Sequence, residues 1–388
     1  MEVEIGIGKS GRRAYGFDDI AIVPSRRTRD PEDIDISWEI DAYKFELPLV
    51  AAAMDGVVSP RIAIEVGNLG GLGCLNLEGL WSRYEDPDAL FEEIAALEPE
   101  KATRRMQEIY AEPIKDELIG QRIREIKDAG VTACASLTPQ RVERYAPMVL
   151  EAELDILVIQ GTVVSAEHVS KDESRQPLNL KKFIREFDLP VIVGGCASYS
   201  TALHLMRTGA VGILVGVGPG HACTTRGVLG IGVPQATAIA DAAGARIRHL
   251  DETGVYVQVI ADGGMRTGGD IAKAIACGAD AVMVGSPLAS ADEAPGRGFH
   301  WGMATFHPSL PRGARVAAGR KASLAEILVG PAHENDGTLN LMGALRTSMA
   351  TTGYETLKEF QKAEVMVAPS FKTEGKILQQ QQGIGMAR

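Results

Sequence analysis

Residues 259–288 read VIADGGMRTGGDIAKAIACGADAVMVGSPL, and they show most clearly the pattern from which we predict the fold. An apolar run ends at Asp262, a helix-length segment follows, and a second apolar run ends at Gly285. Apolar strands that alternate with helices are typical of a parallel sheet buried on both faces. Six similar runs precede this pair, so we predict an α/β fold, a (β/α)₈ TIM barrel. The eight predicted strands are 47–53, 71–75, 131–136, 154–160, 190–195, 210–216, 256–261 and 280–285.

The composition suits one large domain. The chain has 388 residues, is 45% hydrophobic and carries a formal net charge of −11. We expect a single catalytic barrel over residues 1–388, and the acidic balance without a basic stripe disfavours nucleic acid as a partner. No apolar run is long enough to span a bilayer, the N-terminus lacks the pattern of a signal peptide, and the cysteines form no CxxC pair. We therefore expect a cytoplasmic protein with no membrane partner.

Three segments exceed a minimal barrel: 76–115, 287–337 and 365–388. Within the second, residues 305–325 combine Pro, Gly and cationic side chains without a continuous apolar face. Such a segment has little to bury, so we predict a mobile active-site flap there. We interpret the polar residues 365–388 as a C-terminal tail.

The loop after the sixth predicted strand carries the strongest chemical signal. Residues 215–235 read VGVGPGHACTTRGVLGIGVPQ, with Cys223 at the end of a barrel strand, where catalytic groups of such barrels lie. Glycines before it allow close approach of a ligand, and backbone amides nearby favour a thiolate. The pattern favours a nucleophilic thiol at Cys223. A buried structural cysteine and a redox-sensing thiol remain the alternatives.

The ends of the seventh and eighth strands indicate an anion site. Gly263, Gly264, Gly285 and Ser286 lie where barrels bind phosphate, and the amides and helix N-termini there attract negative charge. Asp262 can accept hydrogen bonds from a ribose diol. Flavin-binding barrels carry a very similar run, and tight turns alone are the structural alternative.

Several of these motifs together resemble one family, that of IMP dehydrogenase and GMP reductase. The resemblance covers nearly the whole chain, and its branch is the one that lacks the regulatory CBS pair. The motifs that carry it are AYGFDDIAIVP (14–24), AAAMDGV (51–57), GVGPGHACTTR (216–226), ADGGMRTGGDIAKA (261–274), MVGSPLA (283–289), and the runs APGRGFHWGMA (294–304) and LPRGARV (310–316).

This resemblance implies a reaction. The thiolate adds to C2 of IMP, hydride leaves to NAD, and water hydrolyses the thioimidate to XMP. It also implies a monovalent cation, usually K⁺, held by carbonyls of Gly218, Gly220 and Cys223. We expect a purine mononucleotide (IMP, XMP or GMP) as partner and a homotetramer or homo-octamer.

The resemblance further assigns roles to individual residues. Catalysis falls to Cys223 and Thr225, and to Glu293 as the acid of a reductase. From the cationic segment 305–325 we ourselves choose Arg320 as hydrolytic base or water-orienting group, the alternative being that it only solvates a loop. Substrate binding falls to Met54, His221, Asp262, Gly263, Gly264, Gly285, Ser286, His300, Met303, Ala304 and Glu326. Cofactor binding falls to Gln160, Thr162 and Gly216.

The chain also departs from the family pattern. Gln160 replaces an aspartate used near the nicotinamide, His221 a serine, Leu77 a lysine and His300 a tyrosine. The Arg-Tyr dyad that serves hydrolysis is absent from 305–325. Four functions therefore stay open: an NAD-dependent IMP dehydrogenase, an NADPH-dependent GMP reductase, a non-catalytic purine-nucleotide sensor and a flavin-binding barrel.

Overall fold

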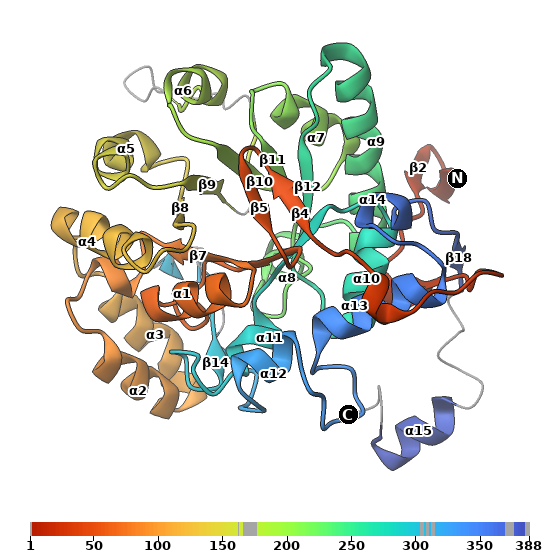
Figure 1. Cartoon of the computed structure of the whole chain (residues 1–388). Helices are drawn as coiled ribbons and strands as arrows, with labels where there is room; N and C mark the ends of the chain where they lie inside the picture. Colours follow the sequence, from red (N-terminus) through yellow and green to blue (C-terminus); the bar gives the residue numbers. More distant parts are fainter. Residues whose placement is uncertain are drawn as a thin grey trace.

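Eight parallel strands close into a barrel at the centre of the molecule, as predicted (Figure 1). The computed structural model describes residues 2–161, 163–165, 177–302, 306–307, 310–311, 315–368 and 376–384. The barrel strands follow one another in chain order, and β13 pairs with β6 to close the ring. They are β6 (Leu49–Ala51), β7 (Leu72–Asn76), β8 (Cys134–Leu137), β9 (Ile156–Gln160), β10 (Val191–Cys196), β11 (Gly212–Val215), β12 (Gln258–Asp262) and β13 (Ala281–Val284).

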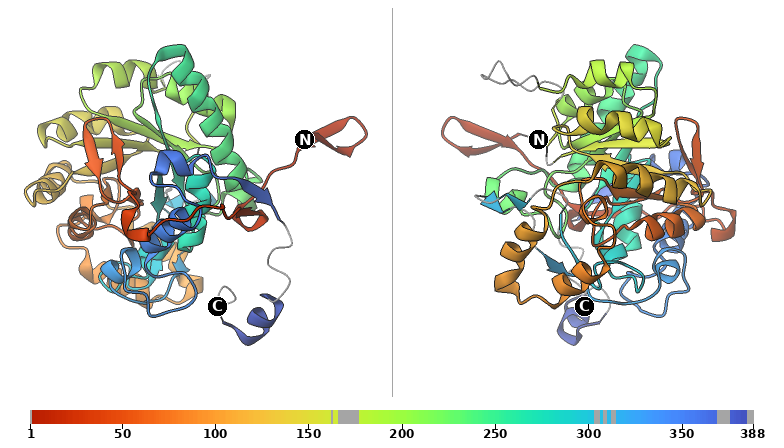
Figure 2. Two further views of the ribbon diagram at one scale, coloured as in Figure 1. Left: turned by 45° about the vertical axis from the view of Figure 1, so that its right-hand side comes forward. Right: turned by 90° about the vertical axis from the view of Figure 1, so that its left-hand side faces the viewer.

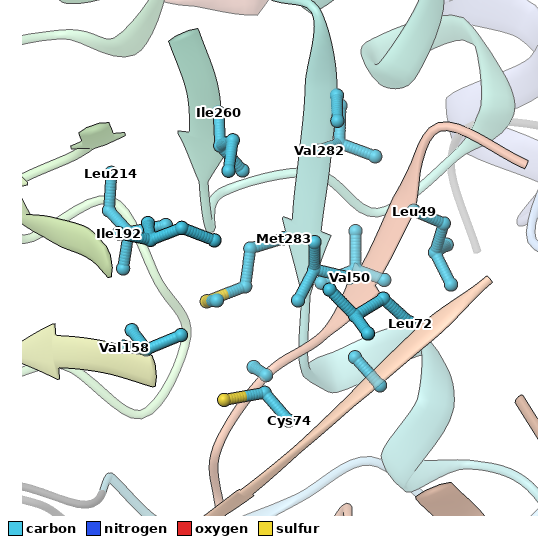
Figure 3. Close-up of a cluster of buried hydrophobic side chains, with 14 of the residues drawn as sticks. Leu49, Val50, Leu72, Cys74, Val158, Ile192, Leu214, Ile260, Val282 and Met283 are labelled. Atoms are coloured by element: carbon cyan, nitrogen blue, oxygen red, sulfur yellow. The ribbon is translucent and has the colours of Figure 1, made fainter. Parts of the chain in front are cut away.

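The barrel interior is a packed core. Side chains from strands all around the ring, Leu72, Val158, Ile192 and Ile260 among them, meet there (Figure 3). Six of the eight strands, all but β9 and β12, are buried at every residue. Burial on both faces explains why these strands appear in the sequence as nearly continuous apolar runs.

Helices surround the barrel, and several begin at residues that the sequence makes suitable caps. The side chains of Ser59, Ser198 and Thr267 each accept a hydrogen bond from a backbone amide of the first turn that follows. The outer helices are α1 (Pro60–Asn68), α4 (Asp116–Lys127), α5 (Val142–Glu151), α6 (Leu180–Glu186), α7 (Tyr199–Met206), α9 (Gln235–Thr253) and α10 (Gly268–Ala276).

Between β7 and β8 the chain forms an insertion that a minimal barrel lacks. It contains η3 (Leu80–Ser82), α2 (Asp88–Ala96) and α3 (Pro99–Ile109). A buried polar network ties this insertion to the barrel: Tyr110 donates its hydroxyl hydrogen to Asp55, while Trp301 Nε1 donates to the Tyr110 hydroxyl at 2.6 Å. Burial raises the pKa of Asp55 to about 6, although the hydrogen bond from Tyr110 lowers it. The network fixes the loop after β6 and the segment after β14 (Phe299–His300) against each other.

The opposite end of the barrel is held by one saturated carboxylate. Asp280 is buried, and its Oδ1 accepts from the Tyr256 hydroxyl at 2.7 Å and from Lys358 Nζ at 2.6 Å. Its Oδ2 accepts from Arg246 Nη1 at 2.7 Å and from the Val259 amide at 2.8 Å. Burial alone would raise the pKa of Asp280, but Arg246 and Lys358 lower it below its usual value. Lys358 belongs to α14 (Leu357–Phe360), so this late helix contacts the residue that precedes β13.

Segments outside the barrel pair with each other. A hairpin of β1 (Glu2–Gly6) and β2 (Lys9–Arg12) projects away from the body of the molecule (Figure 2). Strand β3 (Ile20–Ile22) pairs with β18 (Val365–Val367), which begins the predicted tail. The remaining elements are η1 (Phe17–Asp19), η2 (Pro31–Asp33), β4 (Trp38–Ile40), β5 (Tyr43–Phe45), α8 (Thr225–Leu229), α11 (Ser286–Ala289), β15 (Phe306–His307), β16 (Leu310–Pro311), β17 (Val316–Ala317), α12 (Leu324–Leu328), α13 (Leu341–Thr351) and α15 (Lys376–Gln382).

The predicted flap and tail are described only in part. Of the flap 305–325, residues 306–307, 310–311 and 315–325 are described, and β17 pairs with β14 there. Of the tail 365–388, residues 365–368 and 376–384 are described. Mobility of the flap stays a prediction. In the described part of the chain, no helix combines the length and apolar character needed to cross a bilayer.

Replacing Gly73 with alanine should destabilise the barrel. A Cβ at this position would lie 2.4 Å from Ala63 Cα, so α1 would have to move away from β7. We expect the free energy of unfolding to fall by about 1–3 kcal/mol, the usual cost of overpacking a core. Denaturant unfolding of purified protein measures it.

Gly244→Ala, in α9, is the matched control. Its Cβ would meet only ring carbons of Tyr199, on α7, at 3.7 Å and 3.8 Å. Alanine in a helix interior should leave stability unchanged or raise it by up to about 1 kcal/mol. Equal stabilities of the two variants would contradict the tight packing of α1 on β7.

Candidate active site

A cavity of about 560 Å³ opens at the carboxyl ends of the barrel strands. Its size lies within the range of small-molecule sites, and its place is where such barrels carry chemistry. Most residues proposed from the sequence line it. They are Met54, Gln160, Gly216, Gly218, Gly220, His221, Cys223, Thr225, Asp262, Gly263, Gly264, Gly285, Ser286 and His300.

Cys223 presents its thiol to this cavity. It is the exposed member of the five free cysteines, whereas Cys74, Cys134 and Cys196 are buried. Its Sγ donates to Thr225 Oγ1 at 3.2 Å, and its amide donates to the Gly220 carbonyl at 3.1 Å. The thiol is thus accessible to a ligand and has a hydroxyl beside it that accepts its hydrogen bond.

The loop before Cys223 needs its glycines. A Cβ at Gly216 would lie 2.2 Å from the Asp262 carbonyl oxygen, and one at Gly218, where φ is +77°, would lie 2.6 Å from Arg226 Cγ. Arg226 in turn donates to the Val233 carbonyl at 2.6 Å, which holds the two ends of the loop together. The glycines therefore permit the close contact between the cysteine loop, β12 and Arg226.

The carbonyls proposed for a cation come from this loop. Carbonyl oxygen is the ligand type that K⁺ binds in proteins. The Gly220 carbonyl accepts one hydrogen bond, from the Cys223 amide, and keeps a second lone pair. The Gly220 carbonyl therefore offers the ligand type that a monovalent cation binds. Among the described residues, no group of three or more His, Cys, Asp or Glu side chains is placed to hold a metal ion.

Asp262 and Gln160 form a polar pair in the cavity wall. Gln160 Nε2 donates to Asp262 Oδ2 at 3.1 Å. Burial raises the pKa of Asp262 to about 7, although the hydrogen bond from Gln160 lowers it. Gln160 Oε1 is buried and has no hydrogen-bond partner in the described structure. Together the two side chains offer acceptors to hydroxyl or amino groups of a ligand.

The residues predicted to bind phosphate also lie in the lining of this one cavity. Gly263 and Gly264 have φ values of +74° and +81° directly after β12. Ser286 Oγ and His300 Nε2 are 3.0 Å apart, and the ring centroids of His300 and His221 are 5.8 Å apart in an edge-on arrangement. Burial and, to a lesser degree, the neighbouring His221 lower the pKa of His300 to about 4. Without an anion, His300 is therefore neutral near pH 7.

Three predicted residues lie away from the cavity. Arg320 makes an ion pair with Asp292 at 3.2 Å on the surface. Glu293 Oε2 accepts from the Leu324 amide at 2.9 Å, and Glu326 Oε2 accepts from the Ser323 hydroxyl at 2.7 Å, so both carboxylates serve the N-terminus of α12. The remaining predicted residues, Thr162, Met303 and Ala304, lie outside the described residues.

The cavity also includes residues that the sequence argument missed. Thr138, Pro139 and Gln140 follow β8, while Leu229 and Ile231 follow the cysteine loop. The rule that strand-end loops of a barrel carry function would have found the first three. Leu229 is 38% exposed and Ile231 is 50% exposed, so they form an open apolar wall that suits a flat ring.

The class of protein follows from these observations: a (β/α)₈ barrel whose strand-end cavity holds an exposed thiol and glycine-rich loops. Residues 14–375 match the model of the IMP dehydrogenase / GMP reductase domain, so the chain belongs to that family and is an oxidoreductase of it.

Relatives and a solved structure agree with this assignment. The chain is 52% identical over 374 residues to an uncharacterized oxidoreductase of Mycolicibacterium smegmatis, covering 94% of this chain and 99% of that protein. It is 28% identical to the inosine-5'-monophosphate dehydrogenase of Methanocaldococcus jannaschii, with 94% of each chain covered. An IMP dehydrogenase/GMP reductase-like protein from Corynebacterium glutamicum superposes with a TM-score of 0.89 and 48% identity, covering 94% of this chain and 97% of that one.

The raised pKa of Asp262 predicts a pH effect on stability. Because the folded pKa, about 7, exceeds the value near 4 of an unfolded aspartate, the folded state binds the proton more tightly. This contribution is complete below pH 4 and is lost as pH rises to about 7, with an upper bound on the order of 3–4 kcal/mol. Asp262→Asn should remove it.

Unfolding by urea between pH 4 and pH 8 measures the difference between wild type and Asp262→Asn. Asp55 contributes in the same direction only up to about pH 6, so the interval from 6 to 7 reports on Asp262. Wild-type and variant curves that run parallel throughout this interval would rule out a buried, proton-binding Asp262.

Proposed function

We propose that this chain is an NAD-dependent dehydrogenase that oxidises IMP to XMP through a covalent adduct at Cys223. The supporting observation is the exposed Cys223 thiol, 3.2 Å from Thr225 Oγ1, in the same cavity as Asp262 and the phosphate-type loops. A nucleotide with its phosphate at Ser286 and its ribose at Asp262 extends its base toward the remaining wall, where the thiol lies.

The proposed chemistry has two halves. First the Cys223 thiol loses its proton, its sulfur bonds to C2 of the base, and C2 gives up a hydride, which leaves a thioimidate. NAD⁺ supplies the hydride acceptor when it is bound. Then water adds at C2, the C–S bond breaks, XMP is released and the thiol regains a proton. The sum is IMP, NAD⁺ and water converted to XMP, NADH and a proton.

Residues of the chain divide this work. Thr225 is buried beside the sulfur and accepts the thiol hydrogen bond, so we assign it the relay of the proton at that atom. Asp262 accepts from the ribose hydroxyls in its ionised form. Gln160 Oε1, a buried acceptor with no described partner, fits the amide NH₂ of a nicotinamide.

Water activation needs a group that the described cavity lining does not supply. Arg320, the predicted hydrolytic residue, is engaged by Asp292 on the surface, and an arginine normally stays protonated. We keep it as the group that closure of residues 305–325 would bring to the water, with Thr225 sharing the task. The carbonyls of Gly218, Gly220 and Cys223 would hold K⁺ and so order the loop that carries the thiol.

One observation favours a second candidate, the reduction of GMP to IMP with NADPH. Neither Arg320 nor Glu293 lines the cavity in the described structure, and the reductive reaction releases ammonia without hydrolysing an adduct. The lack of a hydrolytic group in the described lining therefore suits the reductase, whose reaction needs none.

Cys223→Ala should abolish turnover and leave nucleotide affinity within a few fold, because ribose and phosphate contacts lie elsewhere in the cavity. Mass spectrometry of wild type under single-turnover conditions should show an adduct of nucleotide mass. Cys277→Ala, at a half-buried cysteine that does not line the cavity, is the control and should remain active. Normal rates in Cys223→Ala would exclude covalent catalysis at this residue.

Nicotinamide absorbance distinguishes the two reactions. We expect NADH formation from IMP and NAD⁺ in KCl, and a much slower rate when NaCl or a bulky organic cation replaces KCl at constant ionic strength. NADPH consumption with GMP would support the reductase instead. No change with either pair, together with nucleotide binding, would indicate a sensor, and a bound yellow chromophore would indicate a flavin barrel.

A further inference from the structure

The described lining of the cavity lacks a fixed positive charge to meet a phosphate. Among the described residues that line it, there is one carboxylate, Asp262, and no lysine or arginine. A nucleoside 5'-phosphate carries close to two negative charges at neutral pH. Backbone amides and the Ser286 hydroxyl can donate hydrogen bonds, but they do not neutralise that charge. The side chains of this lining that can become positive are His221 and His300.

These two imidazoles lie at the phosphate end. His300 Nε2 is 3.0 Å from Ser286 Oγ, at the start of α11, directly after the eighth barrel strand. His221 approaches the His300 ring edge-on with 5.8 Å between centroids. His300 Nδ1 is buried and has no hydrogen-bond partner in the described structure. Leaving a buried ring nitrogen without a partner is costly, and this ring therefore has no fixed hydrogen bond at Nδ1 in the described structure.

We propose that His300 and His221 form a protonatable clamp, which binds the 5'-phosphate of a nucleoside monophosphate together with a proton taken from solvent. The inference rests on the proposed function, because it assumes that a purine mononucleotide fills this cavity. It adds how the phosphate charge is balanced. A phosphate monoester is then favoured over the same nucleoside without phosphate, and increasingly so as the pH falls from about 9 toward 6.

The groups around His300 support proton uptake, rather than proton release, when phosphate binds. His221 and Cys223 face the cavity from the cysteine loop, Asp262 from β12, and Asp55 lies buried in the loop after β6. Burial first, and the electrostatic effect of His221 second, lower the pKa of His300 to about 4. A phosphate dianion at Ser286 raises the pKa of His300, because an adjacent negative charge favours the imidazolium form. It thereby opposes the lowering of this pKa by burial and by His221.

Asp262 produces a proton change of the opposite sign. Its pKa of about 7 means that it is partly protonated near neutral pH, and it must release that proton to accept from a ribose diol. Inosine, which has the ribose and base but no phosphate, reports this release alone. The difference in proton uptake between IMP and inosine therefore reports on the phosphate end, where the two imidazoles and the phosphate monoester itself titrate, and the His300→Gln and His221→Gln variants assign the imidazole share.

Calorimetric titration in buffers of different ionisation enthalpy measures this difference. At about pH 7.5, we expect IMP to take up between about 0.5 and 1 proton more than inosine, whose binding is measured by displacement with IMP. His300→Gln keeps a donor for Ser286 but cannot be protonated, and it should lose most of the extra uptake and about tenfold in IMP affinity. His221→Gln should lose part of both.

His204→Gln is the matched control, since His204 is exposed on α7 outside the barrel and should bind IMP with the wild-type proton count. Equal proton counts for IMP and inosine in wild type would overturn the clamp while leaving the proposed function in place. Failure of IMP and GMP to bind at all would overturn both. If His300→Gln does not fold by circular dichroism, the wild-type difference and His221→Gln decide the matter.

Discussion

The pairing of β6 with β13 is the constraint on which the site depends. Val282, Met283 and Val284 align with Leu49, Val50 and Ala51, so the first and last strands of the barrel end side by side. The loop that follows β6 therefore meets the loop that follows β13, and a Cβ on Gly285 would lie 2.8 Å from Met54 Sδ. Residues more than two hundred positions apart in the sequence thus form one wall of the cavity.

Closure of the barrel also brings polar groups from different strand ends into one cavity. Glycine-rich loops lie after β12 and β13, a carboxylate and an amide lie beside them, and the thiol lies on the loop after β11. Lysine and arginine are missing from the described lining, where backbone amides and two imidazoles are the groups that can face an anion.

The sequence predicted the barrel well because its strands are buried on both faces. The eight apolar runs match the eight strands to within about three residues at each end, as expected for runs bounded by glycine and turn residues. The glycines of the site, among them Gly218 and Gly263, were predictable for a related reason. They have positive φ values, which few other residue types adopt. By contrast, α2 and α3 could be anticipated only as a long charged insertion.

Contacts between distant side chains were beyond the sequence argument. Arg320 was assigned to hydrolysis from its place in a cationic segment, but the return of the chain beside Asp292 gives it a surface partner. Gln160 was recognised as a departure from the family aspartate, yet its bond to Asp262 follows only from the positions of β9 and β12 across the barrel. Pairing of this kind depends on tertiary geometry and leaves no local pattern.

The saturated carboxylate at the other end of the barrel has a consequence for synthesis on the ribosome. Asp280 enters β13 long before Lys358 and Gln361, which supply two of its donors, have been made. Until α14 emerges, a closed barrel would bury a carboxylate with incomplete compensation, which is costly. Strand β3 likewise waits for β18. The nascent chain therefore gains its full stability only after residues beyond the barrel have left the exit tunnel, so that folding completes late in translation.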